Sequence, residues 1–184
     1  MAANGTVGRR RLWRAVRWVV WGGAAFLLLL PLVAMQFTAE VNWTLFDFIV
    51  MGTMLGLVCG AYEVAVRVAR SNVYVIAAGV AVAAAFLLTW INLAVGIIGS
   101  ENNPANLMFF GVLVIGFIAV LFARLAPLGM ARAMELTAVA QAVVGVIAFF
   151  TTSGQPEAYL LPGFFVAMWL ISAQLFRKAA REQV

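Results

Sequence analysis

Ionisable side chains within long apolar runs are the first candidates for chemistry in this sequence. Glu63 precedes Arg67 by four positions, a spacing that brings both side chains together on one helix face as an ion pair. Asp47 lies near the start of its apolar run, where a carboxylate stabilises a helix N-terminus. A carboxylate buried in lipid is also what a proton or ion carrier needs. We interpret both carboxylates as structural, with a proton or ion site as the alternative for Glu63.

Two uncharged polar residues, Thr53 and Gln141, lie near the middle of apolar runs, and Thr89 is a further candidate there. Glu135 follows Arg132 by three positions and is interpreted, like Glu63, as half of an ion pair on a helix surface. A proton or cation path across a bilayer usually requires a chain of Asp, Glu or His. These residues form no such chain.

Absent residue types narrow the chemistry further. The sequence has no histidine, the commonest general base and a usual zinc or haem ligand. Its single cysteine, Cys59, cannot form a disulfide within the chain and is interpreted as a small buried apolar residue. We therefore expect no catalytic residue, no metal site and no cofactor, and we predict that the protein is not an enzyme.

The composition is that of a chain surrounded by lipid. Of the 184 residues, 65% are hydrophobic and 10% are charged, whereas soluble domains have about 25% charged residues. The formal net charge of +5 comes from basic residues placed before, between and after the apolar runs, where they orient a chain in a bilayer. The expected partner is the lipid bilayer, and nucleic-acid binding is not expected.

Six apolar runs are long enough to cross a membrane as helices, which takes roughly 20 residues. They are Trp18–Phe37, Leu45–Val66, Val73–Ile98, Leu107–Ala123, Ala133–Phe150 and Tyr159–Phe176. The sequence therefore predicts an all-α integral membrane protein with six transmembrane helices in a compact helical bundle. Residues 1–17 are predicted to form a basic cytoplasmic segment, residues 18–176 the transmembrane domain, and residues 177–184 a basic cytoplasmic tail.

The basic residues predict the orientation, because cytoplasmic segments retain Lys and Arg. With six spans and a cytoplasmic N-terminus, all 12 basic residues fall on the cytoplasmic side. Omitting the fifth span would place Arg177, Lys178 and Arg181 outside. Both termini are therefore expected in the cytoplasm, in a multi-pass protein of the inner membrane.

Small residues predict where helices approach closely. Gly52, Gly56 and Gly60 repeat every four positions and share one helix face, a typical packing groove in lipid. Packing within the chain is favoured, and a homodimer seam is the alternative. Alanine and glycine rows occur in the third run at Ala77, Ala81 and Ala85, and in the fifth run at Ala138, Ala142 and Gly145. Two prolines affect helix geometry, since Pro31 predicts a kink and Pro162 is expected in the first turn of its helix.

The stretch Trp90–Met108 contains the longest polar link, Gly99-Ser100-Glu101-Asn102-Asn103-Pro104-Ala105-Asn106. We interpret the link as a tight connection between helices, because Asn and Ser cap helices and Pro stiffens turns. An extracytoplasmic recognition loop is the alternative. The stretch resembles one found in a family of small, uncharacterised, multi-pass bacterial inner-membrane proteins. That resemblance implies a bacterial membrane location and no activity.

The expected function follows from missing catalytic groups, short links and small-residue faces. It is that of a scaffold, accessory subunit or regulator that contacts another membrane protein or a second copy of itself. The alternative is a small-solute or lipid transporter or channel, with its site near Thr53 and Gln141 between the second, third and fifth runs.

Overall fold

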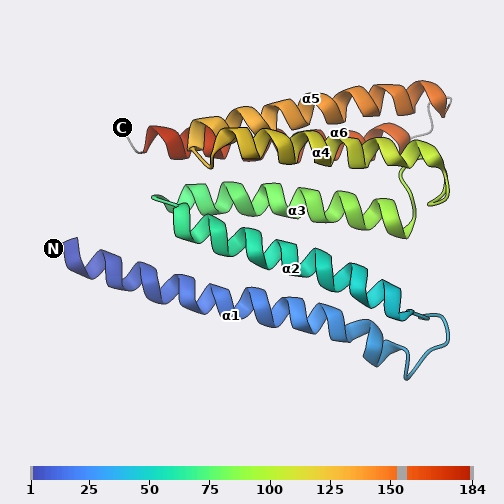
Figure 1. The fold of residues 1–184 in the computed structure, drawn as a ribbon, viewed down its shortest axis with the longest axis horizontal. Helices are drawn as coiled ribbons and strands as arrows, with labels where there is room; N and C mark the ends of the chain where they lie inside the picture. Colours follow the sequence, from blue (N-terminus) through green and yellow to red (C-terminus); the bar gives the residue numbers. More distant parts are fainter. Residues whose placement is uncertain (1, 153–156, 183–184) are drawn as a thin grey trace. The chain divides into compact units, whose positions relative to one another are not determined.

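A computed structural model describes the backbone of residues 2–152 and 157–182, and the side chains of 16–152 and 159–182. Its elements are α1 (Ala2–Ala34), α2 (Leu45–Val68), α3 (Asn72–Ala94), the short 3-10 helix η1 (Pro104–Asn106), α4 (Leu107–Ala123), α5 (Pro127–Thr151) and α6 (Glu157–Arg181) (Figure 1). Six of these helices are long and apolar enough to cross a membrane, and no strand occurs in the described residues. The prediction of an all-helical chain with six such helices is confirmed.

Helix boundaries differ from the predicted runs where turn residues intervene. α4 has the predicted bounds, but α5 begins six residues early, at Pro127, whose fixed φ suits the first position of a helix. α3 ends at Ala94 rather than Ile98, because Gly96 turns the chain with a φ of +73°. α6 begins at Glu157, so Pro162 lies inside this helix and not in its first turn.

The chain divides into two compact units, Met1–Arg67 and Val68–Val184, and each is described by itself. The predicted single domain of residues 18–176 therefore spans parts of both units. The first unit comprises α1 and most of α2, and residues 2–17 of the predicted basic segment form the first half of α1. Pro31 lies inside α1, where its own carbonyl still accepts a hydrogen bond from Met35 N at 2.9 Å.

The second unit packs α6 against both α3 and α5, and α4 packs against α5 and also contacts α3. Successive helices run in opposite directions, as Figure 1 shows, because the links between them are short. Large side chains fill the centre of this unit. Leu88, Phe109, Phe165 and Phe176 are fully buried, and they come from α3, α4 and α6.

Small residues set how closely these helices approach. Ser172 of α6 donates a hydrogen bond to the carbonyl of Ala77 in α3 at 2.9 Å. A Cβ added at Gly145 of α5 would lie 2.9 Å from Cβ of Pro162 in α6. The alanine and glycine rows predicted on α3 and α5 thus each contribute a residue to the contact with α6.

Candidate functional site

Glu63 lies at the centre of a charged cluster in the first unit. Its Oε2 forms an ion pair with the Arg17 guanidinium of α1 and lies 3.7 Å from Arg67 Nη2. Trp21 Nε1 donates to Oε1 at 3.5 Å. The predicted Glu63–Arg67 pair is therefore present, but the nearer partner is Arg17, which lies 46 positions away and could not be found from local spacing. Both carboxylate oxygens have partners, as expected for a structural ion pair.

Asp47 and Thr53 use their polar atoms within their own helix. Thr44 donates to Asp47 Oδ2 from both its backbone N and its hydroxyl at 2.7 Å, and Asp47 N lies 3.4 Å from that hydroxyl. This reciprocal arrangement is a capping box at the start of α2. Thr53 donates its hydroxyl hydrogen to the carbonyl of Ile49 at 2.8 Å. The Asp47 carboxylate therefore accepts within the cap, and the Thr53 hydroxyl donates within its own helix.

Gln141 of the second unit is buried without any hydrogen-bond partner. It is 0% exposed, and neither Nε2 nor Oε1 has a partner among the described residues. Trp169 Nε1 is likewise buried and unpartnered. A buried amide in this state costs about 1–3 kcal/mol. Thr53, another uncharged candidate, belongs to the first unit.

Glu135 has a different partner from the one its sequence neighbours predict. Its Oε1 lies 2.6 Å from Nη2 of Arg177, so the ion pair joins α5 to α6 rather than forming with Arg132. The prediction of a Glu135–Arg132 pair is therefore wrong. Helix spacing alone allows Arg132 as the partner of Glu135. Because α6 packs against α5, Arg177 is the residue that pairs with Glu135 instead. Arg132 is exposed and has no ion-pair partner among the described residues.

Asn106 organises the link between α3 and α4. Its Oδ1 accepts hydrogen bonds from the backbone N atoms of Ile97 and Ile98, at 3.1 and 2.9 Å. Its Nδ2 donates to the carbonyl of Ser100 at 2.7 Å, and its own carbonyl accepts from Asn92 Nδ2 at 2.9 Å. These bonds agree with the interpretation of the link as a tight connection.

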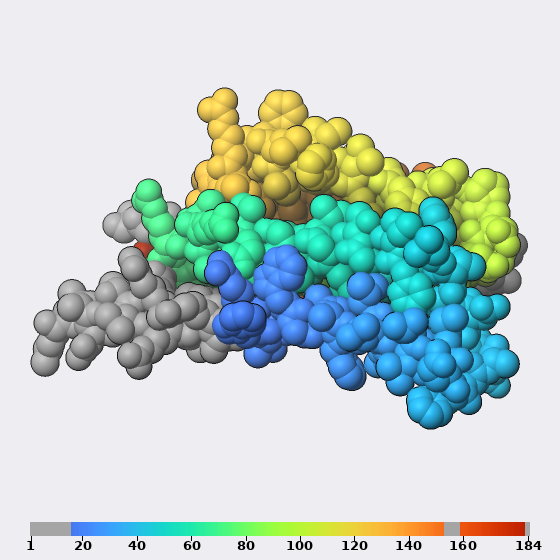
Figure 2. Space-filling view, turned by 60° about the horizontal axis from the view of Figure 1, so that its bottom comes forward, coloured from blue at the N-terminus to red at the C-terminus, as the bar shows by residue number. Residues whose placement is uncertain are grey.

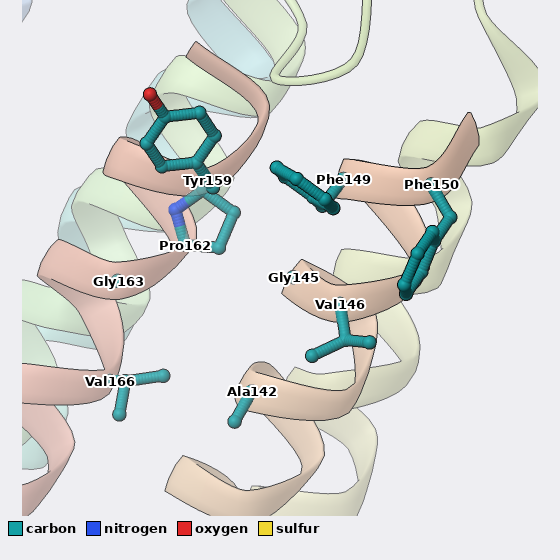
Figure 3. Close-up of a pocket in the computed structure, with 9 residues that line it drawn as sticks. All are labelled: Ala142, Gly145, Val146, Phe149, Phe150, Tyr159, Pro162, Gly163 and Val166. Atoms are coloured by element: carbon teal, nitrogen blue, oxygen red, sulfur yellow. The ribbon is translucent and has the colours of Figure 1, made fainter. Parts of the chain in front are cut away.

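An apolar groove of about 580 Å³ lies between α5 and α6 (Figure 3). Its lining residues are Ala142, Gly145, Val146, Phe149, Phe150, Tyr159, Pro162, Gly163 and Val166. Figure 3 shows Tyr159 and Phe149 towards one end, and Ala142 and Val166 towards the other. The groove has no ionisable group apart from the Tyr159 hydroxyl. It suits an apolar chain without selecting a head group.

A second groove, of about 530 Å³, lies between α4 and α5. Its lining residues are Ile115, Ile118, Ala119, Phe122, Ala123, Gly129, Arg132, Ala133 and Leu136. It differs from the first groove in having a cation, Arg132, among apolar side chains. Sequence spacing did not reveal this groove, because it depends on how two helices pack.

Among the described residues, no group of three His, Cys, Asp or Glu side chains could hold a metal ion. Comparisons with protein-family models, curated proteins and solved structures found no match to the chain. The class defined by the fold is therefore that of a helical chain with six helices able to cross a membrane. Several of its polar residues stabilise helix ends or pair helices, whereas Gln141 is buried without a hydrogen-bond partner and Arg132 is exposed without an ion pair among the described residues.

Proposed function

We propose that this protein acts without catalysis in the cytoplasmic membrane, as a scaffold, accessory subunit or regulator of another membrane component. In this proposal it crosses the membrane six times, with both termini in the cytoplasm. The observation that supports lateral contact is the glycine face of α2, formed by Gly52, Gly56 and Gly60.

Most of this glycine face has no packing partner within its own unit. A Cβ added at Gly52 meets only Leu28 Cδ2 of α1, at 3.8 Å. At Gly56 and Gly60 an added Cβ meets no atom of the unit within 4 Å, and both residues are exposed. Small-residue grooves allow close backbone approach, which drives helix association in lipid. The face therefore suits a helix of a partner protein or of a second copy.

Replacing Gly56 by Leu should weaken that association at least tenfold, because the side chain would occupy the groove. The measurement is purification in mild detergent of tagged wild type and Gly56→Leu, with quantitative mass spectrometry for partners and a second tag for self-association. We expect one membrane component, or the second copy, to be recovered with wild type and reduced at least tenfold with the variant. The variant should not lose stability, because no atom of its unit must move, and it should gain up to about 1 kcal/mol because leucine is a better helix former than glycine.

Gly79→Leu is the matched control, since Gly79 of α3 is also exposed with nothing within 4 Å of an added Cβ. This variant should retain the association. Equal recovery of the component with Gly56→Leu would contradict the proposed contact. A large loss of stability in Gly56→Leu would show that the glycine face packs inside the protein.

The proposed orientation has its own test. Reporter fusions after Val184 should give a cytoplasmic signal, and a cysteine introduced at Asn103 should react with an impermeant reagent added from outside. The physical reason is the one-sided placement of the basic residues. The position Ser153, also expected outside, lies beyond the described residues. A C-terminal fusion that reports an external position would contradict the topology.

A small-solute or lipid transporter or channel is the second candidate, and the unpartnered amide of Gln141 favours it. A protein that conducts a polar solute needs buried groups whose hydrogen bonds are completed by the solute. Both amide atoms of Gln141, Nε2 and Oε1, are buried without a hydrogen-bond partner among the described residues.

Gln141→Leu separates the two candidates. In a structural role the substitution removes an unsatisfied amide and should stabilise the protein by about 1–2 kcal/mol, measured by unfolding in mixed micelles. Gln174→Leu is the control, because Gln174 lies exposed on α6, and its stability should change by less than about 0.5 kcal/mol. Solute flux into liposomes that is present in wild type and lost in Gln141→Leu would favour the transporter.

A further inference from the structure

We infer that the α4/α5 groove binds one anionic phospholipid, with Arg132 contacting the phosphate and the apolar wall contacting an acyl chain. The inference concerns a ligand site that the proposed function does not require. It rests on three features of the second unit, namely the chemistry of the groove wall, the lack of an acidic partner for Arg132, and the depth of Arg132 along α5.

The wall from α4 is wholly apolar, since Leu107–Ala123 contains no ionisable residue. Ile115, Ile118 and Phe122 line the groove, and each is exposed along its open side. From Ile115 to Ala123 this wall extends for about 12 Å. Such a length of apolar surface matches part of an extended acyl chain and is short for docking a whole helix.

The groove is closed at one end by the turn between α4 and α5. A Cβ added at Gly129 would lie 2.9 Å from the carbonyl oxygen of Ala123, so the two helices nearly touch there. Figure 2 shows this part of α4 and α5 at the surface, in yellow to amber. A chain lying in the groove must therefore extend away from the turn, towards the middle of the helices.

The cation at this groove lacks an internal counter-ion. Glu135 is the acidic residue nearest in sequence, and it pairs with Arg177 of α6 at 2.6 Å. Arg124, at the C-terminal end of α4, is a second exposed cation without an ion pair among the described residues. The groove thus combines apolar walls with uncompensated positive charge, which is complementary to an anionic lipid.

The depth of Arg132 fits a lipid phosphate. α5 has 25 residues, which makes it about 37 Å long and longer than the roughly 30 Å hydrocarbon core. Arg132 is the sixth residue of α5, within about 8 Å of its start. Its long side chain can therefore reach the head-group layer while its stem remains on the groove wall.

Native mass spectrometry of the full chain in mild detergent tests the inference, with phosphatidylglycerol and phosphatidylcholine as probes. We expect one phosphatidylglycerol to be retained in preference to phosphatidylcholine. In Arg132→Gln its affinity should fall about fivefold, the factor that one basic side chain contributes near a membrane surface. Ala119→Leu, which fills the groove and keeps the charge, should also weaken binding.

Arg132→Lys should restore most of the binding, because it restores the charge. Lys178→Gln is the control for charge alone, since Lys178 is exposed on α6 outside the groove, and it should bind as wild type does. Inorganic phosphate in excess should not displace the lipid, because it lacks the acyl chain. Equal affinity for the two lipids, or unchanged binding in Arg132→Gln and Ala119→Leu, would overturn the site.

Discussion

Asn106→Ala is expected to destabilise the second unit by roughly 2–5 kcal/mol, because two buried backbone N–H groups lose their acceptor. Ile97 and Ile98 are each 2% exposed, and Oδ1 of Asn106 is the acceptor of both N–H groups. The substitution also removes the hydrogen bond from Asn106 Nδ2 to the carbonyl of Ser100, which keeps only its bond from Asn103 N at 3.0 Å. The measurement is the free energy of unfolding in mixed micelles, followed by tryptophan fluorescence.

Asn102→Ala is the control, because it removes an asparagine side-chain amide from the same link without removing the hydrogen bonds of Asn106. Asn102 is exposed, and its side chain donates to Glu101 Oε1 at 3.1 Å. Its replacement should change stability by less than about 0.5 kcal/mol. Comparable effects of the two substitutions would show that Asn106 does not organise the link.

The helices themselves follow from the sequence, because hydrophobic length in lipid is a strong constraint. Lipid offers no partner for backbone polar groups, so each long apolar run forms a helix. The predicted run Leu107–Ala123 has the same bounds as α4, because no charged residue or proline interrupts its apolar sequence. The predicted third run extends four residues past the end of α3 at Ala94, because Val95, Ile97 and Ile98 are apolar and continue the hydrophobic pattern into a turn.

Side-chain partnerships were predictable only where they are local. The capping box of Thr44 and Asp47 lies within one helical turn, and its spacing indicates it. Glu63 and Glu135 each take a partner from a different helix, Arg17 and Arg177, and no spacing rule selects among distant cations. The groove at Arg132 was missed for the same reason. The charge of Arg132 has no acidic partner because Glu135 pairs with Arg177 of α6 instead.

Gly96→Ala should likewise unfold the second unit at markedly lower denaturant, with a loss of roughly 2–4 kcal/mol, because it combines backbone strain with overpacking. Gly96 has a φ of +73°, which side chains other than glycine rarely adopt. A Cβ there would lie 2.5 Å from the carbonyl carbon of Ser100 and 2.7 Å from Nδ2 of Asn106. The backbone of the link cannot move aside without breaking the hydrogen bonds of Asn106.

Gly79→Ala is the matched control for Gly96→Ala. Gly79 lies exposed within α3, has nothing within 4 Å of an added Cβ, and should gain about 0.5–1 kcal/mol because alanine is the better helix former. Both substitutions add one methyl group to the second unit. Changes of opposite sign in the free energy of unfolding would therefore show that the loss in Gly96→Ala comes from the turn at Gly96. Because a Cβ at position 96 would lie 2.7 Å from Asn106 Nδ2, the double variant Gly96→Ala/Asn106→Ala should lose less than the sum of the single losses. Additive losses would show that the two residues stabilise the link independently.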